Sequence, residues 1–364
     1  MRVLVVTPWF PSPAHRESGI FNLRDARLVA RDHEVRVLHL LRPDWYDATE
    51  STARMDGLDV VRVPFSVTAP GTWYRTAAAL RAALREAELL HTMAAPALLP
   101  FALRRVRIPW VHTEHFSTLV TPVSRPVAVA LGMLSTLFRR PGEVVAVSAA
   151  LARVIDAHRT RPASVIGNEV MLPIDAVPAG HDFEGRIRLI GVGGLLARKG
   201  PLEAVDALAA LVERGVDAEL VWAGDGELRT AMVERARASG VGERLTLLGA
   251  VSPDELSREL LRATMFLLPV ETETFGVAIA EALTHGLPVV TSGTGGHEEF
   301  LEADRSRRVA ERSGAALADA VQDLITDRGL PSRATIARQA AERFSESARA
   351  DGYRRVYANA IAQG

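Results

Sequence analysis

Short runs of apolar residues alternate with longer segments of helical periodicity along the first half of the chain. Val3–Val6 and Val35–Leu40 are short and apolar and contain several β-branched residues, which predicts buried strands. Between such runs, Asn22–Arg31 and Arg75–Glu88 repeat their apolar residues at helical spacing. Strands that alternate with helices form a parallel sheet with helices on both faces. The other strands predicted in this half are Val60–Val63, Leu89–His91, Trp110–Thr113, Val144–Val147 and Ser164–Ile166.

The same alternation restarts beyond a segment that has the composition of a linker. Met171–Gly185 contains two Pro, two Gly and two Asp, which favour turns. After the strands of the second half, Ser345–Ala362 is predicted to form a last helix with no strand after it. We therefore predict an α/β protein with two doubly wound, Rossmann-like lobes and a ligand-binding cleft between the carboxyl ends of their strands. The strands predicted in the second half are Arg188–Val192, Glu219–Trp222, Leu245–Leu248, Met265–Leu268 and Pro288–Thr291.

Length and composition agree with two lobes. The 364 residues are too many for one typical domain, and 48% of them are hydrophobic, enough for two cores. The chain has no Cys, which excludes disulfides and Cys-ligated metals and fits a reducing compartment. The apolar start, Arg2–Val6, is too short for a signal peptide and is predicted to be the first strand.

One apolar run differs from the others in its length. Val127–Phe138 carries no charge and lies between Arg125 and the pair Arg139-Arg140. It is too short to span a bilayer. It could lie on a membrane surface, but a buried helix is the interpretation that we favour.

The charge is unevenly distributed along the chain. The net charge is −1, so the whole chain does not have the charge of a nucleic-acid binder. Residues 1–175 carry 21 basic and 16 acidic side chains, a net charge of +5, and the remainder is correspondingly acidic. A basic first half favours an anionic acceptor or a membrane surface as its partner.

The segment Glu271–Leu283 carries the most specific chemical signal. It follows an apolar strand that ends at Pro269, and from Gly276 its apolar residues recur at helical spacing. The backbone N–H groups of Phe275, Gly276 and Val277 would then lie at the positive end of a helix dipole, where anions bind. The carboxylates of Glu273 and Glu281 could accept hydrogen bonds from hydroxyl groups. Phosphate beside a polyol indicates a nucleotide sugar, whereas the alternative is an ordinary βα unit with two solvated glutamates.

Lys199 is the only lysine in the chain, and it lies in a second loop of this kind. A strand runs into Gly191, Gly193 and Gly194, and the pair Arg198-Lys199 comes directly before a helix that opens at Pro201. Basic side chains at such a position can bind a diphosphate. The alternative is a basic pair on the surface.

Three common nucleotide-binding or metal-binding motifs are absent from the sequence. The residues on either side of Lys199 do not match a Walker loop, and the glycines before it do not continue as a nicotinamide-binding fingerprint. No Asp-x-Asp occurs, so the usual metal–diphosphate clamp is missing. We therefore predict no metal and no cofactor.

Taken in order, the motifs resemble those of family 4 of the retaining glycosyltransferases, which have the GT-B fold. The resemblance covers nearly the whole chain, and the pair Glu273 and Glu281 followed by Gly295-Gly-x-x-Glu299 is its most specific part. Weaker matches are Gly19 with the helix after it, Asp32–Val35, Val147-Ser148, Ile166–Asn168, Gly224–Gly226, Leu248-Gly249, Pro269 and Gly286–Val289.

The resemblance implies an organisation and an activity. Residues 1–172 would be the acceptor-binding lobe and 173–344 the nucleotide-sugar lobe, while the helix 345–364 would return to the first lobe. The enzyme would be a hexosyltransferase that moves a sugar, with retention, from a UDP- or GDP-linked donor to a hydroxyl of a glycan or lipid-linked glycan. It would be cytoplasmic or peripheral at the membrane, and serve polysaccharide biosynthesis.

The resemblance also implies roles for individual residues. The catalytic residues would be His115, near the reaction centre, with Glu273 beside the sugar and Lys199 neutralising the diphosphate. Glu281 would bind the ribose. The remaining donor-binding residues would be Gly19, Arg198, Thr274, Phe275, Gly276 and Val277.

The sequence departs from the family in two places. Family members commonly carry Arg where Gly194 stands, and Arg198 is a possible substitute. The usual pair of glycines in the first loop is reduced to Ser18-Gly19. Alternative functions on the same fold are a sugar-nucleotide epimerase, a phosphorylase with pyridoxal phosphate on Lys199, and a non-catalytic nucleotide-sugar binding protein.

Overall fold

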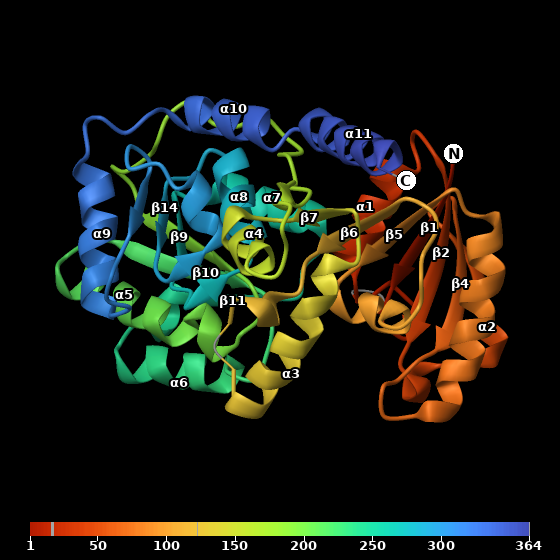
Figure 1. Ribbon diagram of the computed structural model, residues 1–364. Coiled ribbons are helices and arrows are strands. Elements are labelled where there is room, and N and C mark those ends of the chain that lie inside the picture. Colours follow the sequence, from red (N-terminus) through yellow and green to blue (C-terminus); the bar gives the residue numbers. More distant parts are fainter. Residues whose placement is uncertain (16–17, 122, 364) are drawn as a thin grey trace. The chain divides into compact units, whose positions relative to one another are not determined.

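The computed structural model describes residues 1–15, 18–121 and 123–363. The chain divides into two compact units, each with its own sheet (Figure 1). Unit 1 comprises Met1–Glu169 together with Glu346–Gly364, and unit 2 comprises Val170–Ser345. The boundaries predicted at 172/173 and 344/345 thus lie within three residues of those in the structure.

Unit 1 is built on an eight-stranded sheet in the order β3-β4-β2-β1-β5-β6-β7-β8. All neighbouring strands are parallel except β3 and β4, which form an antiparallel edge that the sequence pattern did not predict. The strands are β1 (Arg2–Thr7), β2 (Glu34–Leu41), β3 (Thr52–Met55), β4 (Leu58–Pro64), β5 (Leu89–Met93), β6 (Trp110–Glu114), β7 (Glu143–Ala146) and β8 (Ser164–Val165).

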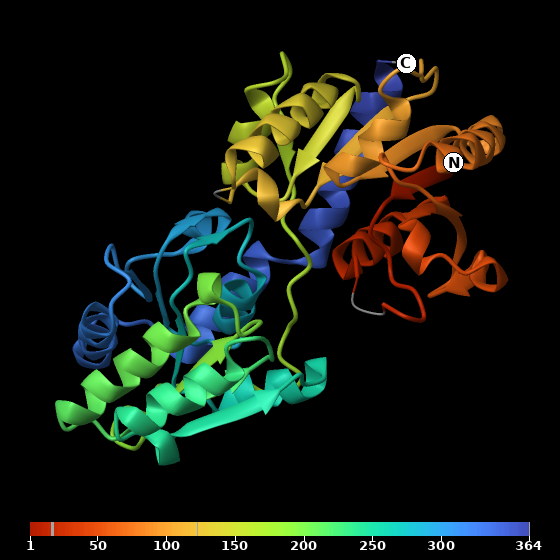
Figure 2. The ribbon, with the colours of Figure 1, turned by 90° about the horizontal axis from the view of Figure 1, so that it is seen from below.

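The helices of unit 1 lie on both faces of this sheet. They are α1 (Ile20–Val29), α2 (Pro70–Glu86), α3 (Arg125–Ser135), α4 (Ala149–Asp156) and α11 (Glu346–Ala362), with short 3₁₀ turns that include η3 (Ala95–Phe101) and η5 (Thr136–Arg139). Although α11 ends the described chain, it packs against α1, β6 and β7 (Figure 2). Its residues Tyr353, Val356, Tyr357 and Ala360 are part of the core of unit 1.

Unit 2 repeats the architecture with a six-stranded parallel sheet in the order β11-β10-β9-β12-β14-β16. The helices α5 and α9 pack together, as do α8 and α10. The strands are β9 (Ile187–Val192), β10 (Ala218–Ala223), β11 (Leu245–Gly249), β12 (Met265–Leu268), β14 (Val289–Thr291) and β16 (Ser306–Arg308). The helices are α5 (Pro201–Glu213), α6 (Arg229–Ala238), α7 (Pro253–Arg262), α8 (Val277–Thr284), α9 (Gly314–Thr326) and α10 (Arg333–Arg343).

Two sequence expectations need correction. The run Val127–Phe138 forms α3 and η5, but it is not a buried helix, because Ser135 is the only residue of α3 that is buried. The loops around Glu273 also contain a two-stranded parallel ladder, β13 (Thr272–Glu273) with β15 (Thr294–Gly295), that was not predicted. Within the described residues, none of the helices combines the length and apolar composition needed to cross a bilayer.

Candidate active site

The two loops singled out in the second half lie next to each other in unit 2. The sheet order changes direction at β9 and β12, which are neighbours in the sheet although two strands, β10 and β11, separate them along the chain. Ligands of open α/β sheets bind at such a switch point, beyond the carboxyl ends of the strands. The loop after β9 carries Arg198 and Lys199, and the loop after β12 carries Glu271 and Glu273.

Glycines allow the loop after β9 to lie close to its neighbours. A side chain on Gly224 (φ 133°) would place its Cβ 2.1 Å from the carbonyl oxygen of Gly193. The amide of Leu195 donates to the carbonyl of Asp225 at 3.0 Å, which fixes the two loops together. A Cβ on Gly193 would lie 3.5 Å from Cδ of Lys199, so the lysine side chain runs along this glycine loop.

Lys199 and Glu273 form an ion pair at this edge of the sheet. Nζ of Lys199 contacts Oε1 of Glu273, and the two side chains are only 14% and 13% exposed. The ammonium group of Lys199 therefore already has an anionic partner. A bound diphosphate would share the positive charge of Lys199 with Glu273.

Close backbone contacts fix the basic turn to the acidic loop. Gly200 (φ 70°) leaves space for Pro269, whose carbonyl oxygen would be 2.1 Å from an added Cβ. The amide of Glu271 donates to the carbonyl of Arg198 at 2.9 Å. Arg312 donates to the carbonyl of Ala197 at 2.6 Å and pairs with Glu271 at 2.9 Å. Arg312 was not predicted as part of this site, because it follows β16, more than a hundred residues after the turn it contacts.

The ladder of β13 and β15 explains why the two most specific motifs occur together. Glu273 pairs with Gly295, and a Cβ on Gly295 would lie 2.0 Å from the carbonyl oxygen of Glu273. A Cβ on Gly276 would lie 2.7 Å from Cβ of His297. The Gly-Gly-x-x-Glu segment therefore packs directly against the Glu273 loop and holds it in place.

The N-terminus of α8 has the features expected of an anion site. Gly276 is its N-cap in the left-handed conformation (φ 93°), and no described side chain caps the helix. The hydroxyl oxygen of Thr274 is buried without a hydrogen-bond partner among the described residues. Glu281 lies on the second turn of α8 and is 8% exposed.

Phe275 has a structural side chain. Its ring contacts Phe300 at 5.3 Å and Phe344 at 6.0 Å between centroids, and the side chain is buried. Aromatic pairs at such distances stabilise a packed cluster. Phe275 therefore anchors the loop, and only its backbone remains to contact a ligand.

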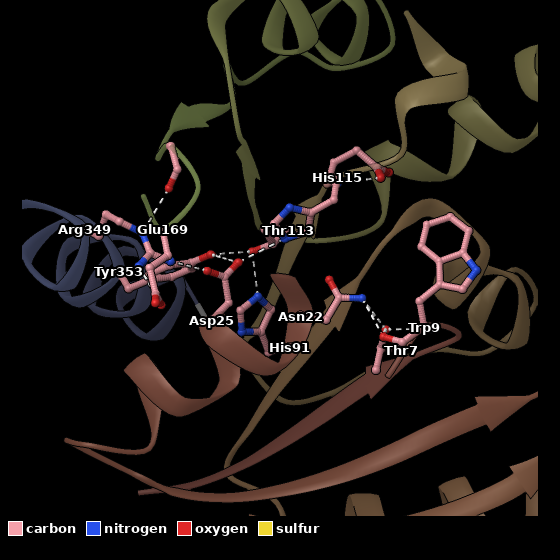
Figure 3. Close-up of polar contacts among 12 residues, drawn as sticks. Thr7, Trp9, Asn22, Asp25, His91, Thr113, His115, Glu169, Arg349 and Tyr353 are labelled. Atoms are coloured by element: carbon pink, nitrogen blue, oxygen red, sulfur yellow. Dashed lines mark hydrogen bonds and ion pairs between the residues drawn. The ribbon is translucent and has the colours of Figure 1, made fainter. Parts of the chain in front are cut away.

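His115 lies in unit 1, immediately after the carboxyl end of β6. Nε2 of His115 is 3.0 Å from Oδ2 of Asp25 on α1 (Figure 3). Because a carboxylate only accepts hydrogen bonds, Nε2 carries the proton and Nδ1 has a free lone pair in the neutral ring. Nδ1 is buried and has no partner among the described residues, so it can accept a hydrogen bond from a ligand hydroxyl.

Asp25 was not predicted, and it is held from the far end of the chain. Arg349 and Tyr353, both on α11, donate to its carboxylate at 2.6 Å and 2.8 Å (Figure 3). Burial alone would raise the pKa of Asp25, but the hydrogen bonds from His115 and Tyr353 and the positive charge of Arg349 lower it below its usual value. The spacing of Arg349 and Tyr353, four residues apart on one helix face, is the one sequence signal that could have indicated a buried acidic partner.

Gly19 begins α1, also at a close backbone contact. Its φ is 68°, and an added Cβ would lie 2.1 Å from the carbonyl oxygen of Trp9. The side-chain Nδ2 of Asn22 donates to the hydroxyl of Thr7 and to the carbonyl of Trp9, both at 2.8 Å. Thr7 and Trp9, at and just after the end of β1, are thus fixed against the start of α1.

The predicted residues fall into one set in each unit. Unit 2 brings together Lys199, Glu273 and the loop 274–277, with Arg198 in the same turn as Lys199 and Glu281 on the helix that follows. Unit 1 holds His115 and Gly19. In the described part of the chain, no group of three or more His, Cys, Asp or Glu side chains is arranged to hold a metal ion; that the activity needs none stays a prediction.

The chain is similar in sequence to known glycosyltransferases. Residues 26–170 match the family described as Glycosyltransferase Family 4, and residues 176–349 match Glycosyl transferases group 1. The chain is 29% identical over 369 residues to a GDP-mannose-dependent α-(1-6)-phosphatidylinositol monomannoside mannosyltransferase of Mycobacterium tuberculosis, covering 90% of each protein. It is 27% identical over 384 residues to a phosphatidyl-myo-inositol mannosyltransferase of Mycobacterium leprae, covering 100% of this chain and 98% of that protein.

A solved structure has the same fold. The lipopolysaccharide outer core galactosyltransferase WaaB superposes with a TM-score of 0.79 at 14% identity, covering 98% of this chain and 99% of that one. The prediction of two parallel α/β lobes of the GT-B type is confirmed by this likeness and by the two sheets.

Proposed function

Because the chain belongs to the glycosyltransferases of group 1 and family 4, we propose that it transfers a mannosyl group from GDP-mannose to a hydroxyl of a phosphatidylinositol-linked acceptor. The glycosyltransferase activity follows from the family. The choice of donor and acceptor is supported by the mycobacterial mannosyltransferases, which align with nearly the whole chain. An epimerase, a phosphorylase and a binding protein without activity have no such support.

The observation that carries the proposal is the Lys199–Glu273 pair beside the N-terminus of α8. In the reaction the bond between the sugar C1 and the diphosphate oxygen breaks, and C1 bonds to the acceptor oxygen. The acceptor proton leaves with the released diphosphate. Lys199 and the N–H groups of α8 would stabilise the negative charge that develops on the diphosphate, and Glu273 would lie by the sugar.

Retention of configuration and independence from metal ions complete the proposal. Attack on the same face of the sugar from which the diphosphate departs would preserve the anomeric configuration. Nδ1 of His115 would accept a hydrogen bond from a sugar hydroxyl, since it is the unpaired atom of that ring. The basic first half favours a peripheral location at the cytoplasmic face of an anionic membrane, where a lipid-linked acceptor would be available.

A direct test combines ligand binding with turnover. Thermal unfolding with GDP, UDP and ADP should show the largest stabilisation by GDP. Transfer from GDP-mannose to a short-chain phosphatidylinositol mannoside should survive dialysis against a chelator, and NMR should show an α-linked product. A product with inverted configuration, or activity that returns only with added Mg²⁺ or Mn²⁺, would contradict the mechanism.

Substitution of Lys199 tests the residue that carries the proposal. Lys199→Ala should lose roughly 2–4 kcal/mol of transition-state stabilisation, as for other oriented electrostatic groups. Arg198→Ala on the same turn is the comparison, because Arg198 is itself predicted to bind the donor. If Arg198→Ala is the more damaging change, Arg198 has the role that family members give to the Arg missing at Gly194.

A further inference from the structure

Beyond its first residue, Arg125, the helix α3 of unit 1 carries no charge and is yet exposed. Residues 126–138 include no charged side chain. Val127, Val129 and Met133 are 42%, 60% and 71% exposed. A helix that is apolar all round is normally buried in a core or a membrane, so this surface requires an apolar partner.

The packing of α3 determines which side faces outward. Leu131, Leu134 and Ser135 are the least exposed positions of the helix, and they lie on one face at a spacing of three or four residues. Val129 and Met133 lie four residues apart on the opposite face. Leu103, at the end of the neighbouring turn η3, is fully exposed and adds to the apolar surface.

Two groups of arginines lie in segments next to η3 and η5, the turns that α3 contacts. One group, Arg104, Arg105 and Arg107, immediately precedes β6, and Arg139 and Arg140 immediately precede β7. Since β6 and β7 are parallel neighbours, their amino ends meet at one edge of the sheet. Arg140 connects the two groups, because it donates to the carbonyls of Phe101 and Arg104 at 3.0 Å and 2.5 Å.

These arginines are not neutralised by nearby carboxylates. Within the part of the chain that the structure describes, the five of them and Arg125 form no ion pair, whereas nearby Arg161 pairs with Glu143 at 3.4 Å. Arg139, Arg140, Arg159 and Arg161 line a surface cavity of about 540 Å³ that also contains His158. Of these four arginines, only Arg161 pairs with a carboxylate among the described residues, so the excess of positive charge around the open cavity favours an anionic group of phosphate size.

We propose that α3, Leu103 and these arginines form a membrane-docking surface for a bilayer that contains anionic lipids. The apolar side chains would enter the interface while the guanidinium groups bind lipid phosphates. A second copy of the chain fits this surface less well, because a symmetric contact would bring the arginines of both copies together. This docking surface rests on the proposed function, because it would hold the enzyme at the membrane that contains the lipid-linked acceptor.

The helix α2 offers a matched comparison in the same unit. It also exposes aromatic and basic side chains, including Tyr74 at 82%, Arg81 and Arg85. However, its exposed surface includes Glu86, which pairs with Arg36 at 2.7 Å. Its surface is therefore of mixed charge, and it is not part of the docking surface that we propose.

The test is co-sedimentation of the full chain with vesicles. Wild-type protein should bind vesicles of equimolar phosphatidylcholine and phosphatidylglycerol and should bind phosphatidylcholine vesicles weakly. Val129→Gln with Met133→Gln should weaken binding at least about tenfold, the effect of withdrawing one apolar side chain from the interface. Arg105→Ser with Arg107→Ser should weaken it roughly 25-fold, at about fivefold for each charge near the surface.

Matched variants on α2 and on the exposed residue Val67 just before it, called the α2 variants below, keep the test specific. Val67→Gln with Tyr74→Gln, and Arg81→Ser with Arg85→Ser, remove the same kinds of groups and should leave binding within about twofold of wild type. Unfolding curves that match wild type should confirm that the exposed substitutions preserve the fold. If the α2 variants lose binding and the α3 variants keep it, or if wild type binds both kinds of vesicle equally, the docking surface is wrong.

Transfer to a water-soluble acceptor separates this inference from the proposed function. The α3 variants should transfer mannose to a short-chain acceptor at the wild-type rate and lose transfer to acceptor embedded in vesicles. Wild-type vesicle binding by the α3 variants, with intact transfer to the soluble acceptor, would overturn the docking surface alone. Absence of mannosyl transfer by wild type, with vesicle binding as described, would overturn the proposed function and leave the surface standing.

Discussion

The ion pair between Lys199 and Glu273 means that the charge of each side chain affects what the other can bind. Without a ligand, Glu273 neutralises the lysine, and both side chains are mostly shielded from water. A bound diphosphate brings additional negative charge to the same ammonium group. Glu273 would therefore oppose binding of a diphosphate to Lys199, while the proposed function needs Glu273 beside the sugar.

This opposition separates the two glutamates in a binding experiment. Glu273→Gln should bind bare GDP at least as tightly as wild type, because Lys199 is freed for the diphosphate, while mannosyl transfer falls. Glu281→Gln should weaken GDP by about 1–3 kcal/mol, since a ribose hydroxyl loses a buried charged acceptor. Calorimetric titration of each variant with GDP measures both effects.

The matched control is Glu298→Gln, which changes an exposed glutamate of unit 2 near the same loops. It should leave GDP binding unchanged, because its partner is Arg308 at 3.5 Å and not Lys199. If Glu273→Gln weakens GDP as much as Glu281→Gln does, the roles of the two glutamates are assigned wrongly.

At the scale of elements, α11 connects the end of the described chain to His115. Arg349 and Tyr353 hold Asp25, and Asp25 holds the ring of His115. A second contact runs from Tyr357 to Nδ1 of His91 at 2.8 Å. The orientation of a predicted catalytic ring thus depends on a helix more than 200 residues further along the chain.

The connection predicts a large effect of a small substitution. Asp25→Asn leaves the buried guanidinium of Arg349 without its close anionic partner and should destabilise unit 1 by about 3–5 kcal/mol in urea unfolding. It also allows the ring of His115 to take the other tautomer, so the pH profile of transfer should change. Tyr353→Phe removes a single hydrogen bond and should cost only about 1 kcal/mol.

Asp32→Asn is the matched control, because Asp32 also pairs with an arginine of α11, Arg354, at 2.8 Å. Both of these side chains are exposed, so the substitution should change stability little. Equal losses of unfolding free energy for Asp25→Asn and Asp32→Asn would show that the buried network around Asp25 stabilises the unit no more than the exposed pair does.

The elements also show what the sequence allowed us to predict. Strands such as Met265–Leu268 were predicted at the observed bounds, because a short apolar run between turn residues leaves few alternatives. The exposure of α3 was predicted wrongly, since an apolar helix has the same local pattern whether protein or another partner covers it. Asp25 was missed because its partners are 90 and 324 residues away, and β13 and β15 were missed because two-residue strands have no periodicity.

On the scale of the whole molecule, each unit contains a buried neutral histidine. Burial lowers the pKa of His39 in unit 1 and of His285 in unit 2 to about 4. An unfolded histidine titrates near pH 6.5. Below that pH the unfolded chain binds protons that the folded units do not, so stability is lost as the pH falls from about 6.5 to about 4.

Each histidine should therefore lower the free energy of unfolding of its unit by about 2 kcal/mol at about pH 5 relative to pH 7. Urea unfolding at the two pH values, followed by a probe in each unit, measures the loss. In His39→Leu the free energy of unfolding of unit 1 should depend less steeply on pH. That of unit 2 should keep the pH dependence of wild type. An unchanged slope in unit 1 would show that His39 is not the group responsible.

The return of α11 to unit 1 has a consequence for biosynthesis. The ribosome releases the chain from its N-terminus, so Val170–Ser345 is complete while α11 is still untranslated. The nascent first unit then lacks Tyr353, Val356 and Tyr357 from its core and leaves Asp25 without its arginine. Unit 2 can mature first, and unit 1, although translated earlier, closes only when its final helix has left the exit tunnel.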